Sequence, residues 1–190
     1  MNKKTLVILI AVCVAAAVAG GILLRDIITS STKPAASSPD TSSAPVVYKA
    51  LSQGDAAPDF TAALAGGGSF TLSEHKDEVV LVNFWATWCP PCVGELPAFE
   101  QMKNDGIDGF SFVAVNCSED KSTVDAFLAE NGYTFAVAYD EDGAIGNMYP
   151  TDGIPYTLLI RNGIIEKTYL GAPRDAYDEY KSAVGEALQK

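Results

Sequence analysis

The sequence has few of the side chains that bind metals, because its 190 residues include one histidine and four cysteines. Two of the cysteines, Cys89 and Cys92, form a close pair, whereas Cys13 and Cys117 stand alone. A structural zinc ion usually needs four ligands, commonly from two such pairs. Neither His75 nor Cys117 belongs to a second pair, so the composition argues against a zinc site. We expect no metal and no bound cofactor.

Basic residues are also scarce. The chain has 13 lysines and arginines against 24 aspartates and glutamates, a net charge of −11. The first 45 residues carry a net charge of +2, so the remainder carries −13. Nucleic-acid binding depends on basic patches, and docking on anionic lipid does too. This charge argues against a nucleic-acid partner and against close contact of the acidic part with a membrane surface.

Charge is absent from residues 5–24, which follow Lys3 and Lys4. The uncharged run is long enough to span a bilayer, and the preceding lysines predict that the N-terminus stays in the cytoplasm. We assign residues 1–28 to this N-terminus and a transmembrane anchor. The competing interpretation is a cleaved signal peptide, because residues 17–19 read Ala-Val-Ala. The length of the run favours the uncleaved anchor.

Aromatic and branched aliphatic residues are missing from residues 29–45, where Ser, Thr, Ala and Pro dominate. Such a stretch buries too little apolar surface to offset its ordering entropy. We interpret residues 29–50 as a flexible linker that holds residues 51–190, an extracytoplasmic domain, away from the membrane. The protein is then a single-pass protein of the cell membrane, and we expect it to be a monomer.

The pair of cysteines encloses two prolines, Cys89-Pro90-Pro91-Cys92, between a strand-like run and a predicted helix. The N–H groups and dipole of a helix N-terminus stabilise a thiolate there, and thiol–disulfide exchange requires a thiolate. Proline is tolerated in the first turn, whose N–H groups have no helical partner. A purely structural disulfide is the alternative, but so short a loop constrains the unfolded chain little. The pattern favours a redox-active disulfide.

Apolar patterning and turn residues predict an alternation of strands and helices. The predicted strands are 59–64, 69–72, 79–86, 110–117, 135–139, 155–160 and 164–170, and the predicted helices are 89–104, 122–131, 144–149 and 175–188. Pro97 should kink the first helix or end its first segment. Ser122 is a candidate N-cap of the second helix and Gly132 its C-cap. The order indicates a three-layer α/β domain.

With the pair placed on a strand–turn–helix, a resemblance emerges. Residues 82–92, VNFWATWCPPC, resemble the active-site segment of the thioredoxin superfamily. Glu95 and Pro97 make the chain similar to the TlpA/ResA-like, membrane-anchored branch, and residues 153–157 resemble the cis-proline loop of that fold. The resemblance covers about residues 55–188. It implies a thioredoxin-like fold, with a central mixed β-sheet flanked by helices and an N-terminal β-hairpin extension.

The catalytic residues that we expect are Cys89, Cys92 and Glu95. Cys89 lies at the helix tip and should attack, and Cys92, one turn further in, should resolve the mixed disulfide. Glu95 matches a glutamate beside the site in ResA-like proteins, and its i, i+3 spacing puts it on the face of Cys92. Asn83 replaces the buried aspartate of thioredoxin and cannot accept a proton. The alternative for Glu95 is an ordinary solvated helix residue.

The resemblance also suggests residues that contact the substrate. Pro155, in the cis form, would turn the chain so that the backbone of Ile154 faces the disulfide and pairs with an extended segment of the partner. We expect Trp88 and Pro90 to line the approach surface. Trp85 is expected in the core.

A glutamate beside the thiols and prolines between them favour a reductant over a strong oxidant. The resemblance implies a membrane electron donor of the CcdA type and disulfide-bearing exported targets, such as apocytochrome c or an exported methionine sulfoxide reductase. An oxidative protein-folding catalyst is the main alternative. A peroxiredoxin-like peroxidase fits less well, since Thr87 precedes Cys89 by two residues, not three. A non-catalytic binding module would not need the thiol pair.

Overall fold

The computed structural model describes residues 49–190. The expected anchor, and the linker up to residue 48, lie outside the described residues. Between residues 49 and 190, no helix is both long and apolar enough to cross a membrane. The boundaries between anchor, linker and domain therefore remain predictions.

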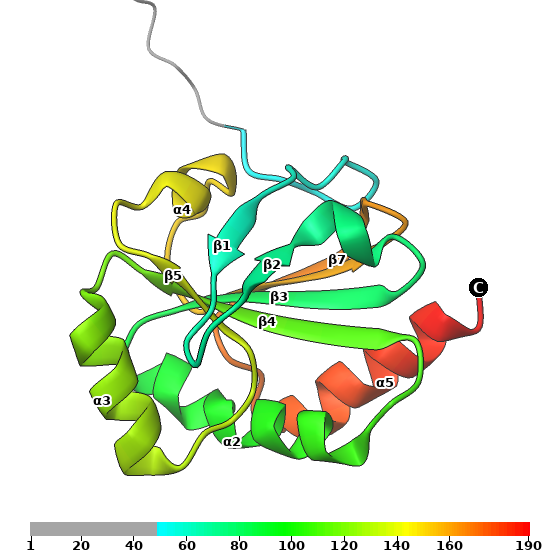
Figure 1. Ribbon diagram of the computed structural model, residues 1–190. Coiled ribbons are helices and arrows are strands. Elements are labelled where there is room, and N and C mark those ends of the chain that lie inside the picture. Colours follow the sequence, from blue (N-terminus) through cyan, green and yellow to red (C-terminus); the bar gives the residue numbers. More distant parts are fainter. Residues whose placement is uncertain (1–48) are drawn as a thin grey trace, which may run out of the picture. The chain divides into compact units, whose positions relative to one another are not determined.

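A five-stranded mixed sheet forms the centre of the described part, in the order β5-β4-β3-β6-β7 (Figure 1). The central strand is β3 (Val79–Trp85), which pairs in parallel with β4 (Phe110–Cys117), and β4 pairs in parallel with β5 (Val137–Asp140). On the other side, β6 (Tyr156–Arg161) and β7 (Ile164–Leu170) run antiparallel. All of β3 is buried, which explains its continuous apolar sequence.

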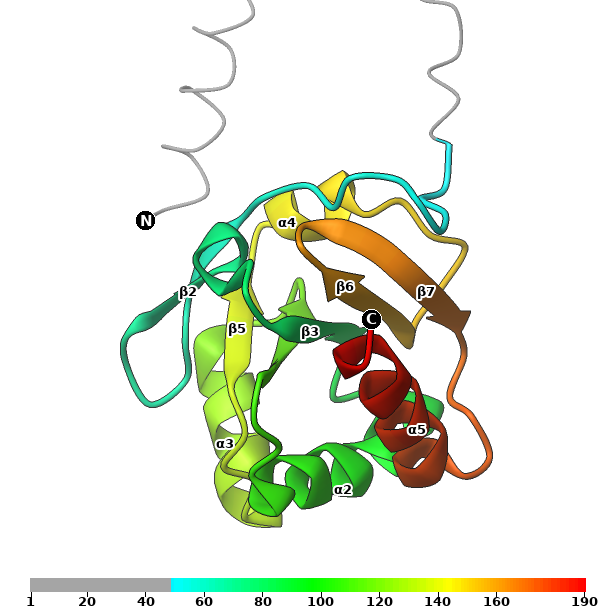
Figure 2. The same ribbon diagram turned by 90° about the vertical axis from the view of Figure 1, so that its right-hand side faces the viewer.

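The two faces of this sheet are covered differently (Figures 1 and 2). One face packs against the three longer helices, α2 (Pro90–Asp105), α3 (Lys121–Asn131) and α5 (Ala176–Leu188). The other packs against β1 (Thr61–Ala63), β2 (Ser69–Thr71), the 3-10 helix η1 (Leu72–His75) and α4 (Ala144–Met148). Strands β1 and β2 form a separate antiparallel sheet, the expected N-terminal hairpin. The mixed sheet with flanking helices confirms the predicted fold class.

Alternation along β3 determines which side chains reach each layer. Leu81 and Trp85 join the core beneath the three longer helices, whereas Val82 and Phe84 join the core beneath the hairpin. Asn83 has the parity of Leu81 and Trp85, so it points towards α2 and α5. Trp85 is fully buried, as expected.

Several element ends differ from the sequence predictions. Helix α2 continues through Pro97 to Asp105, so Pro97 does not end a first segment, because burial of Leu96 and Phe99 holds the helix on the sheet beyond it. The N-cap of α3 is Asp120 and not Ser122, which lies inside the helix. The backbone carbonyl of Asp120 already accepts hydrogen bonds from the N–H groups of residues 123 and 124.

Two predicted turns are confirmed by their backbone angles. Gly132 ends α3 with a φ of 70°, in the left-handed region that glycine adopts at low cost. Asn162 and Gly163 both have positive φ, 53° and 73°, between β6 and β7. This is the geometry of a two-residue hairpin turn. The tight turn places β7 antiparallel beside β6, and β7 is the edge strand of the sheet.

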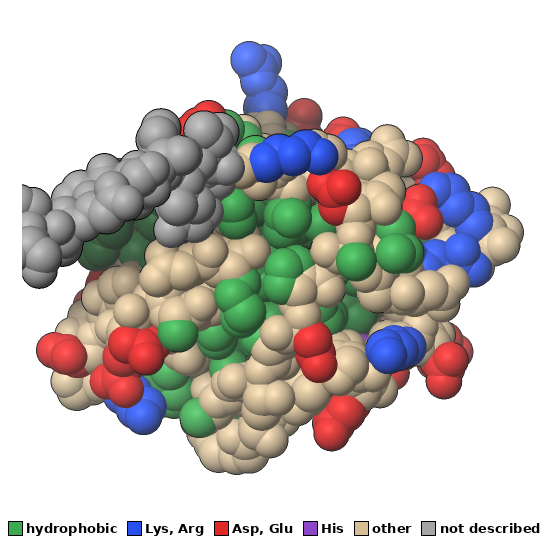
Figure 3. Space-filling view, turned by 90° about the horizontal axis from the view of Figure 1, so that it is seen from above, with side chains coloured by type: hydrophobic (Ala, Val, Ile, Leu, Met, Phe, Trp, Pro, Cys, Tyr) green, Lys and Arg blue, Asp and Glu red, His purple; other side chains and the backbone are tan. Residues whose placement is uncertain are grey.

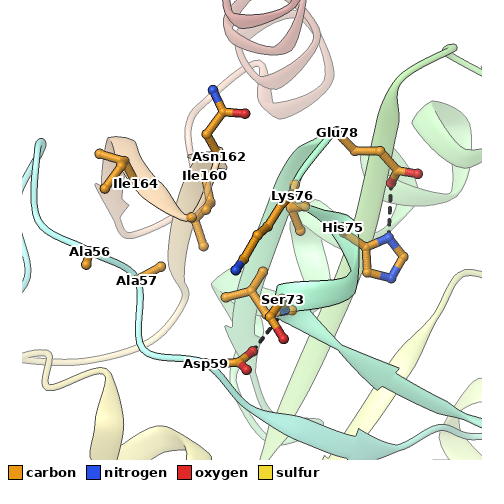
Figure 4. A pocket seen from close by; sticks show the side chains of 13 residues that line it. Ala56, Ala57, Asp59, Ser73, His75, Lys76, Glu78, Ile160, Asn162 and Ile164 are labelled. Atoms are coloured by element: carbon orange, nitrogen blue, oxygen red, sulfur yellow. Dashed lines mark hydrogen bonds and ion pairs between the residues drawn. The ribbon is translucent and has the colours of Figure 1, made fainter.

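The surface on the hairpin side carries apolar side chains near its centre and charged side chains mainly towards its rim (Figure 3). A cavity of about 350 Å³ lies between η1, the segment at Ala56 and Ala57, and the β6–β7 turn (Figure 4). It adjoins the start of β3, whereas the cysteine pair follows the end of that strand. His75 lines it, stacked on Phe70 at 4.5 Å between ring centroids, with Nδ1 3.1 Å from the Glu78 carboxylate.

Candidate active site

Cys89 and Cys92 are joined in a disulfide at the N-terminus of α2. Cys89 is the N-cap residue in extended conformation, and Pro90 and Pro91 occupy the first helical positions. The backbone N–H of Cys92 donates a hydrogen bond to the Cys89 Sγ, with an N–S distance of 3.3 Å. The sulfur of Cys89 therefore takes the place of a capping side chain. In the reduced protein the same N–H and the helix dipole would stabilise a thiolate on Cys89.

The exposure of the two cysteines differs less than the helix-tip position suggested. Cys89 is 4% exposed and Cys92 is completely buried. Cys89 is thus the more accessible sulfur, but it does not project into solvent, because the loop before β6 lies against it. The Cys89 Sγ is 3.8 Å from the carbonyl oxygen of Ile154. By contrast Trp88, the residue before Cys89, is 67% exposed, and Pro90 is also exposed.

The loop against the disulfide contains the cis peptide bond that the resemblance implied, between Ile154 and Pro155. The Pro155 carbonyl oxygen accepts a hydrogen bond from the N–H of Gly171, at 2.8 Å, just after the end of β7. This contact ties the loop to the edge of the sheet. The loop thereby brings the Ile154 backbone next to Cys89, although the two residues are 65 positions apart.

Glu95 is 1% exposed, which excludes the alternative that it is a solvated helix residue. Asn83 Nδ2 donates to its Oε1 and the Tyr180 hydroxyl donates to its Oε2, each at 2.8 Å. Burial raises the pKa of the Glu95 carboxyl to about 7, although the hydrogen bonds from Tyr180 and Asn83 oppose the rise. One helical turn after Cys92, the protein thus holds a carboxyl group that can exchange a proton near neutral pH.

Two further contacts organise this region and were not predicted from the sequence. The backbone N–H of Thr87 and the side-chain amide of Asn116 both donate to Glu119 Oε2, each at 2.8 Å. These bonds fasten the turn between β3 and Cys89 to the end of β4. The other contact is that of Tyr180 with Glu95, which joins α5 to α2. No local sequence signal pointed to either contact.

Cys117 is the only free cysteine among residues 49–190. Burial, followed by the negative charge of Asp140, raises the pKa of its thiol to about 12. Such a thiol is protonated at neutral pH and a poor nucleophile. This agrees with the interpretation of Cys117 as a small packing residue. Across the same residues, no group of three or more potential metal ligands comes together.

Comparison with known proteins identifies relatives of this chain. The Redoxin family profile matches residues 52–185. "Thiol-disulfide oxidoreductase ResA" of Geobacillus kaustophilus is 33% identical over 127 residues, which are 64% of this chain and 71% of that protein. The protein of the same name from Bacillus subtilis is 35% identical over 125 residues, 65% of this chain and 70% of that protein.

Solved structures show the same fold. StoA from Bacillus subtilis superimposes with a TM-score of 0.60 at 27% identity, over 66% of this chain and 96% of that one. A thiol:disulfide interchange protein from Chlorobium tepidum gives a TM-score of 0.62 at 29% identity, over 73% of this chain and 99% of that one. With the Cys-x-x-Cys disulfide at the start of α2, these matches show that the chain belongs to the Redoxin family, as a ResA-like thiol–disulfide oxidoreductase of the thioredoxin superfamily.

Proposed function

We propose that this oxidoreductase works outside the cytoplasm as a reductant of disulfides in exported proteins, with Cys89, Cys92 and Glu95 as its catalytic residues. The observation that carries the proposal is the buried Glu95 carboxyl one turn behind Cys92. A carboxylate there opposes a thiolate, whereas a strong oxidant stabilises its thiolate. The geometry therefore favours a dithiol that gives up its electrons.

The reaction has two exchange steps. The Cys89 thiolate attacks one sulfur of the partner disulfide, forms a mixed disulfide and expels the other partner sulfur as a thiolate. Cys92 then loses its proton to the Glu95 carboxylate and attacks the Cys89 sulfur. This attack closes the Cys89–Cys92 disulfide and releases the second partner sulfur. Two electrons pass to the partner, and the proton of Cys92 remains on Glu95 until solvent or the leaving thiolate takes it.

The partner approaches over Trp88 and the loop at Ile154 and Pro155. An exposed aromatic side chain next to the disulfide offers apolar contact area. The Ile154 carbonyl beside Cys89 is placed to pair with the backbone of an extended segment. Pro90, exposed between the cysteines, completes the surface. Recognition through backbone atoms would suit several exported targets, including apocytochrome c and an exported methionine sulfoxide reductase.

An exported reductant needs electrons from inside the cell, so we propose a membrane electron donor of the CcdA type. The test of direction uses two mixtures. The reduced protein should reduce a disulfide-bonded peptide nearly to completion, and the oxidised protein should oxidise the matching dithiol peptide poorly. The two mixtures contain equal amounts of peptide and are quenched with acid. Chromatography then measures how much peptide has been reduced or oxidised in each mixture, which gives the direction of electron flow. Efficient oxidation of the dithiol peptide would instead support the oxidative folding catalyst.

The location of the domain makes a separate prediction. Lys3 and Lys4 before the uncharged residues 5–24 predict an N-terminus in the cytoplasm and residues 51–190 outside. Protease added to intact protoplasts should remove the domain and leave a short membrane fragment. A cytoplasmic protein serves as the control for intact cells. A protected domain would contradict the topology, and a mature protein that begins near Gly20 and is free in the medium would contradict the anchor.

A further inference from the structure

Glu95 belongs to a closed ring of four buried polar side chains. Asn83 comes from β3, Thr157 from β6 and Tyr180 from α5, and Glu95 itself comes from α2. Asn83 Nδ2 lies 2.8 Å from Glu95 Oε1 and 2.9 Å from Thr157 Oγ1. The Tyr180 hydroxyl lies 2.8 Å from Glu95 Oε2 and 3.3 Å from Thr157 Oγ1. The ring links the strand that leads to the cysteines with the strand that follows Pro155.

When Glu95 is ionised, the hydrogens in this ring have one consistent arrangement. An amide nitrogen only donates, so the Asn83 side chain donates its two N–H hydrogens to Glu95 and Thr157. The Thr157 oxygen accepts from Asn83, and its own hydrogen is free to go to the Tyr180 oxygen. Tyr180 then gives its single hydrogen to Glu95. Both chains of donors then end on the carboxylate of Glu95, with one donor on each oxygen, and these two hydrogen bonds stabilise the ionised form.

This arrangement opposes the effect of burial. A buried carboxyl group without hydrogen-bond donors would stay protonated well above neutral pH, and a protonated carboxyl group could not take a proton from a thiol. The hydrogen bonds from Tyr180 and Asn83 both lower the pKa of Glu95 against the rise caused by burial. The two donors thus decide whether the group is able to act as a base. Tyr180 supplies the larger of these two opposing effects.

We propose that Tyr180 is a positioning residue of the redox site: its hydroxyl, with the Asn83 amide, orients the Glu95 carboxyl and keeps it ionised until Cys92 releases a proton. Tyr180 acts through Glu95 and does not touch the sulfurs or the partner in this proposal. The proposal rests on the role proposed above for Glu95. It adds that Tyr180, a residue of α5, influences the pH at which the oxidoreductase resolves its mixed disulfide.

The variant that tests this is Tyr180→Phe. It deletes one hydrogen-bond donor and keeps the aromatic ring of residue 180. This aromatic ring stacks on Phe99 at 5.3 Å and meets Tyr169 edge-on at 5.1 Å between centroids. The matched control is Tyr177→Phe, on the same helix, which deletes a hydroxyl that donates to Asp105 at the surface. The full oxidised chain, in detergent micelles, is labelled with ¹³C at the glutamate carboxyls. The Glu95 signal is identified by its loss in Glu95→Gln.

The titration midpoint of Glu95 should move up by about 1 pH unit in Tyr180→Phe, a tenfold change in its acid constant, as expected for the loss of one hydrogen bond to a charged group. It should not move in Tyr177→Phe. The pH profile for resolution of the mixed disulfide should shift by the same amount. Asn83→Ala removes the other donor and should shift the midpoint in the same direction, which covers the case that Tyr180→Phe does not fold.

The outcomes separate the two proposals. An unchanged Glu95 midpoint in a folded Tyr180→Phe variant would overturn the role of Tyr180, even if Glu95→Gln impairs thiol exchange. A shifted midpoint with no effect of Glu95→Gln on thiol exchange would leave the Tyr180–Glu95 coupling intact and refute the proposed role of Glu95. A shift of equal size in Tyr177→Phe would mean that α5 perturbs the carboxyl non-specifically, and it would also overturn the role of Tyr180.

Discussion

A Cys92→Ala variant should accumulate mixed disulfides with partner proteins, and a Cys89→Ala variant should accumulate none. The reason is the difference in position at the start of α2. The Cys89 sulfur has the N–H of Cys92 beside it and lies next to the Ile154 backbone, where a partner would bind. Cys92 is completely buried and reaches only the sulfur of Cys89. Without Cys92 the first exchange proceeds and the second cannot.

The measurement is non-reducing electrophoresis and mass spectrometry of acid-quenched cells that express each variant. Both variants should lose disulfide-reducing turnover by several orders of magnitude, because each removes one of the two exchange steps. Cys117→Ala is the matched control, since its half-buried thiol has a pKa raised to about 12 and should contribute nothing to trapping. Equal trapping by the Cys89→Ala and Cys92→Ala variants would contradict the assignment of attacking and resolving cysteines.

Glu95→Gln should stabilise the oxidised protein at pH 8 by about 3 kcal/mol, and most of the gain should vanish near pH 4.5. Burial raises the pKa of Glu95 from 4.5 to about 7 in the folded protein. The folded state therefore binds the proton more tightly than the unfolded state does. The stability that Glu95 contributes is fully present below pH 4.5 and is lost as the pH rises through 7. Glutamine keeps the shape of the side chain, but it does not ionise, so no buried charge destabilises the folded state at high pH.

Urea unfolding of residues 49–190 at the two pH values gives the comparison. Glu100→Gln, on the same helix, is the control with the opposite sign. Burial raises the pKa of Glu100, but hydrogen bonds from Thr134 and Phe135 outweigh it and hold the pKa below its usual value. Removing that charge should lower stability at pH 8. A Glu95→Gln protein no more stable than the wild type at pH 8 would contradict the claim that burial raises the pKa of Glu95 and so destabilises the folded protein at that pH.

Local pattern predicted the parts of the fold that depend on short segments. The strand from Phe110 to Cys117 has the predicted bounds, because its buried apolar run is bordered by turn residues. The Asn162-Gly163 turn follows from the conformations that those two residues accept. The helix ends were less predictable, as Asp120 and Ser122 show, because several residues near the start of α3 can cap a helix and packing selects one of them.

The pair of cysteines was found from sequence because its four residues are contiguous. The sequence of α2 also carries a signal for the burial of Glu95. Glu95 lies on the stripe of α2 that Cys92, Leu96 and Phe99 mark at helical spacing, and this stripe faces the core. Tyr180 had no such signal, because a tyrosine on the apolar face of a helix is ordinarily interpreted as a packing residue. Its contact with Glu95 spans 85 positions and exists only once the fold forms.

The most direct test of the central claim is the reduction potential of the Cys89–Cys92 couple, titrated against glutathione at pH 8 for the wild type and Glu95→Gln, with thiol-alkylation pH profiles of both. If the Glu95 charge opposes the thiolate, the variant should have a lower thiol pKa and a potential about 30 mV or more towards the oxidising side, since 30 mV corresponds to about 1.4 kcal/mol for this couple. Identical potentials and identical thiol pKa values would contradict the claim that Glu95 tunes this site for reduction.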